Sequence, residues 1–208
     1  MRLEALAVAL PDVAGHPNRV PFEGVLTLVD EPSNRPPSGA RGHRVILTRA
    51  AAVLALPSLL GMAVDYTPGW DGHDARRKCG IITEADVEGN RLQVSGYLFG
   101  KDFPEVEEQM RRSHAGAMGM SYEIADAHVA DMNANVWSLT RATFTGAAIL
   151  LREKAAYRET SFRLAAKRCR NAGLSAKGAP DRVWTERPRR PQGSNNGQLE
   201  KGKEARCR

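Results

Sequence analysis

Apolar and polar side chains alternate along several stretches of the chain, which is the pattern of half-buried β-strands. Residues 21–30 place Phe22, Leu26 and Leu28 on one face. Residues 81–99 read as a hairpin with a Glu-Gly-Asn turn. The pattern predicts further strands at residues 44–48, 117–124, 136–144 and 146–151.

Two segments between these strands have helical patterns. Thr48 is expected to cap an Ala- and Leu-rich helix over residues 49–56. Asp102 is expected to cap a second helix, with Pro104 in its first turn and Glu105 completing a capping box. Because most elements are joined as hairpins, we predict a mainly β fold with some α (α+β). Its architecture would be a partly open antiparallel β-barrel with flanking helices.

The net charge of +6 is unevenly distributed along the chain. Residues 164–208 hold 12 Lys or Arg and 4 Asp or Glu, so this segment carries +8 and residues 1–163 carry −2. The basic segment is rich in Gly, Pro, Ser and Asn. We therefore predict a β-barrel domain over residues 1–163 and a basic, disordered tail over residues 164–208. Such a tail would make non-specific contacts with polyanions.

Three cysteines without a Cys-x-x-Cys pair indicate neither a zinc ribbon nor a disulfide framework. A reducing compartment fits this composition best. No stretch reaches the roughly 18 apolar residues that a membrane-spanning helix needs. The apolar run at the N-terminus is too short for a signal sequence. These features predict a soluble intracellular protein with no membrane partner.

The stretch best suited to chemistry covers residues 56–83, where an apolar run leads into a turn-rich loop followed by β-branched residues. His73 lies in this loop, and an imidazole can act as a general base near neutral pH. Ser121 lies two residues after Gly119 in a predicted strand. A serine becomes an effective nucleophile when a neighbouring base takes its proton. Ser121 and His73 are therefore the candidate catalytic residues.

Other interpretations of these residues stay open. The alternative histidines are His16, His43, His114 and His128. Among them, His128 lies only seven residues after Ser121. Equally, Ser121 can be an ordinary strand serine and His73 a solvated loop residue. Asp71 and Asp74 flank His73, but this loop has too few ligands for a metal ion, so we predict no metal and no cofactor.

Three stretches of the chain carry a family resemblance. The first consists of Leu-Leu at residues 59–60, His-Asp at residues 73–74 and Gly-Ile-Ile at residues 80–82. The second is Gly-Met-Ser-Tyr at residues 119–122, which resembles a Gly-Leu-Ser-Ile nucleophile strand. The third is a closing strand at residues 139–148. In this order, over residues 20–155, they resemble the prohead (capsid maturation) serine proteases of tailed phages, which are similar in fold to the herpesvirus assemblins.

The resemblance implies a herpesvirus-protease-like fold and a serine protease of virion assembly. Ser121 would be the nucleophile, His73 the general base and then the general acid, and backbone N–H groups would stabilise the oxyanion. The implied substrates are the phage or prophage scaffold protein, the major capsid protein and the protease itself. Cleavage would occur within the procapsid, in the host bacterial cytoplasm. A homodimer is left open.

The closing strand has Arg141 where the family has an acid, so the third catalytic residue is not evident. The candidates for it are Asp74, Glu123, Asp126 and His128. One alternative is a catalytically inactive structural or scaffold-associated phage head protein of the same fold, which Arg141 favours. Another is a nucleic-acid-binding protein that acts through its basic tail.

Overall fold

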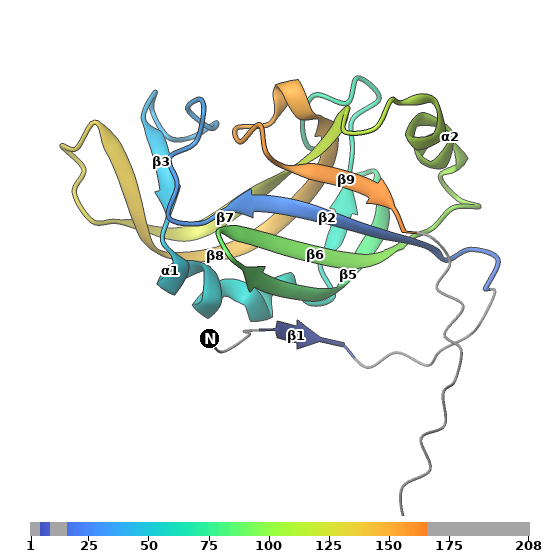
Figure 1. Cartoon of the computed structure of the whole chain (residues 1–208), viewed down its shortest axis with the longest axis horizontal. Coiled ribbons are helices and arrows are strands. Elements are labelled where there is room, and N and C mark those ends of the chain that lie inside the picture. The colour runs from blue at the N-terminus through green and yellow to red at the C-terminus, as the bar shows by residue number, and fades with distance from the viewer. Residues whose placement is uncertain (1–4, 9–15, 166–208) are drawn as a thin grey trace, which may run out of the picture. The chain divides into compact units, whose positions relative to one another are not determined.

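The computed structural model describes residues 5–8 and 16–165, and this part of the chain confirms the predicted α+β class, with mostly strands and few helices (Figure 1). The strands are β1 (Ala5–Ala7), β2 (Val20–Leu28), β3 (Arg44–Leu47), β4 (Ala63–Asp65), β5 (Lys78–Glu88), β6 (Arg91–Leu98), β7 (Met118–Val129), β8 (Val136–Leu151) and β9 (Ser161–Leu164). The helices are α1 (Arg49–Ala55) and α2 (Pro104–Arg112), with short 3₁₀ turns at η1 (Leu56–Leu59) and η2 (Arg152–Lys154). Among the described residues, no helix has both the length and the apolar character needed to span a membrane.

The strands form a single curved sheet that is not closed. Its order is β3-β8-β4-β5-β6-β2-β9, with β1 paired to β5 and β7 paired to β8. Figure 1 shows β2, β6 and β9 crossing in front of β7 and β8, with the core between these two layers. Most pairs are antiparallel, as predicted, but β3 and β4 run parallel to β8. The predicted antiparallel arrangement therefore holds for most pairs but not for these two.

Strand β8 organises the part of the sheet that carries the candidate site. It is one continuous strand of 16 residues where the sequence pattern predicted two. β7 pairs along one edge of β8, and β3 and β4 pair with different parts of the opposite edge. The residues of β8 near its C-terminal end therefore lie between β4 and β7.

The predicted apolar faces form the core. Phe22, Leu26 and Leu28 are all buried, as the alternation along residues 21–30 indicated. The predicted cap of α1 is also confirmed, because Thr48 Oγ1 accepts a hydrogen bond from the backbone N–H of Ala51 at 3.2 Å. Local sequence signals thus position α1 directly before the turn that leads into β4.

The predicted capping box of the second helix was wrong. Helix α2 begins after Phe103, which makes no capping hydrogen bond through its side chain. Asp102 instead accepts a hydrogen bond from Asn18 Nδ2 at 2.8 Å. Glu105 accepts one from the hydroxyl of Tyr66, which belongs to the loop after β4. Both carboxylates therefore bind partners from other parts of the fold instead of forming the predicted capping box.

One strand, β9, lies where the sequence pattern predicted none. In β9, Phe162 is 4% exposed and stacks on Phe22 with ring centroids 5.0 Å apart. Leu164, the first residue of the predicted tail, pairs with Phe22 in β2. The rest of the predicted disordered tail, from residue 166 onward, lies outside the described residues.

Candidate functional site

The candidate site is built on Ala148 of β8, which has a partner on each side. Asp65 of β4 pairs with it from one edge, and Ser121 of β7 pairs with it from the other. Residues that pair directly across a sheet point to the same face. Asp65 and Ser121 therefore share one face, about 10 Å apart at the backbone, because neighbouring strands are about 4.8 Å apart.

The loop over residues 66–77 carries His73 to this face. The carbonyl oxygen of Trp70 accepts a hydrogen bond from the N–H of Leu151 at 2.7 Å, which ties the loop to the end of β8. The Trp70 ring also stacks on Tyr66, with centroids 4.9 Å apart. Within the loop, Thr67 Oγ1 and Asp71 Oδ1 are hydrogen-bonded at 2.7 Å. These anchors hold the part of the loop that precedes His73.

His73 lies between two carboxylates contributed by different strands. Its Nδ1 is 3.3 Å from Oδ1 of Asp65 and 3.9 Å from Oε2 of Glu123. Glu123 follows Ser121 by two residues along β7 and so lies on the same face of that strand. The sheet thereby brings His73, Asp65, Glu123 and Ser121 into one neighbourhood.

Asp65 is the most buried charged group at the site, with a side chain only 1% exposed. Its second oxygen, Oδ2, accepts a hydrogen bond from Lys78 Nζ at 2.8 Å. Burial raises the pKa of the Asp65 carboxyl, but the interactions with His73 and Lys78 outweigh burial and hold this pKa below its ordinary value. Asp65 is therefore an ionised carboxylate facing Nδ1 of His73.

No hydrogen bond joins Ser121 to His73. Within the described part of the chain, Nδ1 and Nε2 of His73 are both buried and neither meets hydrogen-bond geometry with a partner. The Nδ1 edge of the ring is turned toward Asp65 and Glu123. Catalytic hydrogen bonds are often long or misaligned before substrate binds. The structure therefore joins His73 to Asp65 and places Ser121 on the same face of the sheet as Asp65, without a hydrogen bond between Ser121 and His73.

The floor of the site consists of small residues of β8. Gly146 pairs with Glu123, and Ala148 pairs with Ser121. A Cβ atom at Gly146 would approach Oε2 of Glu123 to 2.6 Å, so a side chain there would displace this carboxylate. Small residues at these positions leave room for the groups that face His73.

The four candidates for the third catalytic residue lie in different parts of the structure. Glu123 lies near His73, as described above. Asp74 is next to His73 in sequence, but its carboxylate faces Arg76 and Arg77, at 3.1 Å and 3.6 Å. Those arginine contacts, the side-chain hydrogen bond from Arg76 foremost, hold the pKa of Asp74 below its ordinary value.

Asp126 and His128 lie farther along β7, beyond the residues that face His73. Asp126 is exposed, with a φ of 51°, in an irregular part of the β7–β8 pairing. His128 is exposed and pairs with Arg141 of β8. Arg141 precedes Ala148 by seven residues, which corresponds to about 23 Å along a strand. An arginine at this position therefore lies far from His73.

The remaining histidines have other surroundings. His43 stacks on Trp137 with ring centroids 4.5 Å apart, and His16 accepts a hydrogen bond from the backbone N–H of Asn18. His114 lines a small cavity near the start of β7. None of them is brought to the face that carries Ser121.

Sequence reasoning missed Asp65 as a functional residue. The available signal was a single acid at the end of a short apolar run, directly before the loop that carries His73. Polar residues at strand ends next to loops are common at functional sites. Its partnership with His73 depends on a loop fold and a parallel pairing that no local pattern indicates.

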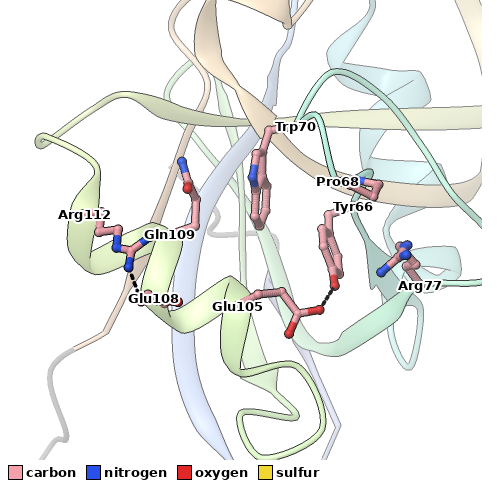
Figure 2. Close-up of a pocket in the computed structure, with 8 residues that line it drawn as sticks. All are labelled: Tyr66, Pro68, Trp70, Arg77, Glu105, Glu108, Gln109 and Arg112. Carbon is pink, nitrogen blue, oxygen red and sulfur yellow. Dashed lines mark hydrogen bonds and ion pairs between the residues drawn. The ribbon is translucent and has the colours of Figure 1, made fainter.

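A cavity of about 310 Å³ lies between the His73 loop and α2 (Figure 2). Figure 2 shows Trp70 standing between Gln109 on α2 and the hydrogen-bonded pair Tyr66 and Glu105. Neither Ser121 nor His73 is among the described residues that line it. The described residues also hold no group of three or more His, Cys, Asp or Glu side chains arranged to bind a metal ion.

Comparison of the chain with models of known protein families, with curated proteins and with solved structures finds no match. Function is therefore inferred from the chemistry that Ser121, His73 and Asp65 can perform, together with the family resemblance of the sequence.

Proposed function

We propose that the protein is a serine endopeptidase of phage head maturation. The observation that carries this proposal is the position of His73. Its Nδ1 faces the buried carboxylate of Asp65, which shares the partner Ala148 with Ser121. A carboxylate on one side of an imidazole and a serine on the other is the arrangement that serine hydrolases use.

In the proposed reaction, Ser121 Oγ attacks the carbonyl carbon of the scissile peptide bond while His73 Nε2 takes the hydroxyl proton. The tetrahedral intermediate then breaks its C–N bond, and the leaving amine receives that proton from His73. Water attacks the acyl group on Ser121 with His73 again as base, which releases the second product. In this reaction Nδ1–H of His73 turns to donate a hydrogen bond to Asp65, so that Nε2 acts as the base.

Asp65 takes the place of the acid that Arg141 replaces in the closing strand. Its position on β4 supports an active enzyme despite this departure from the family. The proposed substrates are the scaffold protein, the major capsid protein and the protease itself, within the procapsid in the host cytoplasm. Self-cleavage and cleavage of the co-expressed capsid and scaffold proteins of its phage are the activities to measure.

A fluorophosphonate probe, which reacts covalently with activated serines, tests the proposal directly. We expect the wild-type chain to be labelled at Ser121, with the site assigned by mass spectrometry, and Ser121→Ala to be unlabelled. Ser138→Ala is the matched control, because Ser138 also lies on a strand of this sheet but outside the site. Equal labelling of Ser121→Ala and wild type would exclude Ser121 as the nucleophile.

The second candidate is a catalytically inactive phage head protein of the same fold. The observation that favours it is the missing hydrogen bond between Ser121 and His73. This protein would not react with the probe and would leave co-expressed capsid proteins uncut. It would instead co-purify with assembled heads whether or not Ser121 is present.

A further inference from the structure

A bulge in β5, at Cys79, aligns Asp65 with Lys78. Ala63 pairs with Ile81 and Val64 with Gly80, so regular pairing would place Asp65 opposite Cys79. Cys79 is fully buried and belongs to the core. The register shifts after Val64, and Asp65 pairs with Lys78 instead. Bulges next to active sites commonly redirect a side chain in this way.

Ser121, Ala148 and Asp65 form a row of directly paired residues across β7, β8 and β4. The bulge adds Lys78 to this row as a fourth member. Lys78 of β5 pairs with Asp65, so the row crosses four strands on one face of the sheet. The Lys78 side chain is 38% exposed and reaches inward to Oδ2 of Asp65 at 2.8 Å. An isolated buried carboxylate is strongly destabilised, and a partner that both donates a hydrogen bond and carries opposite charge offsets that cost.

We propose that Lys78 is a positioning residue: it holds the Asp65 carboxylate by one oxygen, so that the other oxygen stays directed at Nδ1 of His73. This inference rests on the proposed function of the site. Lys78 does not touch the reacting atoms and acts only through Asp65. A residue that orients the partner of a histidine fixes which ring nitrogen carries the proton.

Lys78 also sets the charge that faces His73. The groups around this imidazole are Asp65 from β4 and Glu123 from β7, with Lys78 from β5 bound to Asp65. Asp74 in the same loop is paired with Arg76 and Arg77. With Lys78 in place, the cluster of Asp65, Glu123 and Lys78 carries one net negative charge. It becomes neutral overall when His73 takes up a proton during the reaction.

Lys78→Met in the full chain tests this role, with Lys78→Arg as the conservative variant and Lys101→Met as the matched control. Lys101 is exposed and lies outside the site. Removing the cation leaves two carboxylates facing the imidazole, so the protonated ring is favoured. We expect Lys78→Met to move the midpoint of the His73 ring signals in an NMR pH titration upward by about one pH unit.

Probe labelling of Ser121 at pH 7 is expected to slow by about tenfold in Lys78→Met, because an upward shift of one pH unit corresponds to a tenfold change in the protonation equilibrium. Lys78→Arg should retain most of the wild-type rate and midpoint, and Lys101→Met all of both. If Lys78→Met does not fold, Lys78→Gln replaces it, because its amide can still donate to Asp65 without the charge.

An unchanged His73 midpoint in a folded Lys78→Met or Lys78→Gln chain would overturn the role of Lys78. Loss of thermal stability with an unchanged midpoint would also overturn it, because a merely structural lysine gives that result. Absence of labelling in the wild type would count against the proposed function alone. In that case the NMR midpoint still decides whether Lys78 controls the charge around His73.

Discussion

Asp65 and Ser121 pair with the same residue, Ala148, from opposite edges of β8. They are 56 positions apart in sequence, yet the sheet places them on one face with a single strand between them. His73 reaches this face from the loop after β4, with Nδ1 3.3 Å from Asp65. Three short segments thus contribute one residue each to the candidate site.

Ser121→Ala and His73→Ala are each expected to lower the rate of self-cleavage by at least about 10³-fold, and the double variant to be no worse than either. Residues that act as one unit give such non-additive losses. Self-cleavage rates provide the measurement, because Ser121→Ala has no hydroxyl for the probe to label, and His128→Ala is the control because His128 lies next to Arg141. Losses that simply multiply in the double variant would show that the two residues act independently.

Asp65→Asn is expected to reduce labelling by about 10⁴-fold, because an amide favours the wrong protonated nitrogen of the imidazole. Asp74→Asn should have little effect, since Asp74 faces Arg76 and Arg77. Glu123→Gln should cost about fivefold, as expected for a solvent-screened charge near 4 Å. If Asp74→Asn were the most damaging of the three, Asp74 rather than Asp65 would be the partner of His73.

Gly146→Ala is expected to displace the Glu123 carboxylate and to slow labelling to about the same degree as Glu123→Gln. The new Cβ atom would lie 2.6 Å from Oε2 of Glu123 if nothing moved. The flexible Glu123 side chain can turn aside, so we expect a melting temperature close to that of the wild type. Gly72→Ala in the His73 loop is the control, because a Cβ atom there meets nothing within 4 Å. Faster labelling in Gly146→Ala would contradict a supporting role for Glu123.

Tyr66→Phe is expected to lower the free energy of unfolding by about 1–2 kcal/mol at pH 7, because it removes the hydrogen bond to Glu105. Burial, followed by this hydrogen bond, raises the pKa of Tyr66 to about 12 from an ordinary value of 10.0. The folded state therefore favours the neutral phenol, and its stabilisation is present below pH 10 and is lost between about pH 10 and 12.

Urea unfolding of wild type and Tyr66→Phe from pH 7 to pH 11 measures this difference. The stability advantage of the wild type should shrink as the pH rises above 10. An advantage that is constant or grows over that range would contradict the assigned pKa shift of Tyr66.

Truncation after residue 165 is expected to leave the melting temperature within about 2 °C of the full chain, because it removes none of the described residues. Truncation after residue 160 removes β9, and with it Phe162, which is 4% exposed. Loss of such a buried aromatic side chain costs about 3–5 kcal/mol, so the shorter chain should melt at least 5 °C lower. Thermal melts of the three chains give the comparison. A large loss on truncation after residue 165 would place the tail boundary farther along the chain.

Local patterns determined much of the fold. Alternation predicted β2, the β5–β6 hairpin and β7, because each buries one face and leaves the other polar. Thr48 marked the start of α1 through a hydrogen bond that is local to the helix end. The strand–loop–strand arrangement around His73 and the strand that carries Ser121 were also predicted from residue types alone. The short strand β9 was missed, because it depends on β2, a partner distant in sequence.

Only the tertiary structure decided which groups meet at the site. The sequence determined that His73 lies in a loop and Ser121 in a strand, since both follow from short-range patterns. The selection of Asp65 over Asp74, Asp126 and His128 required the parallel pairing of β4 with β8 and the antiparallel pairing of β7 with β8. The bulge at Cys79 of β5 then aligned Lys78 with Asp65. Pairing partners and registers are set by the packing of the whole sheet, so the sequence near any one of these residues does not specify them.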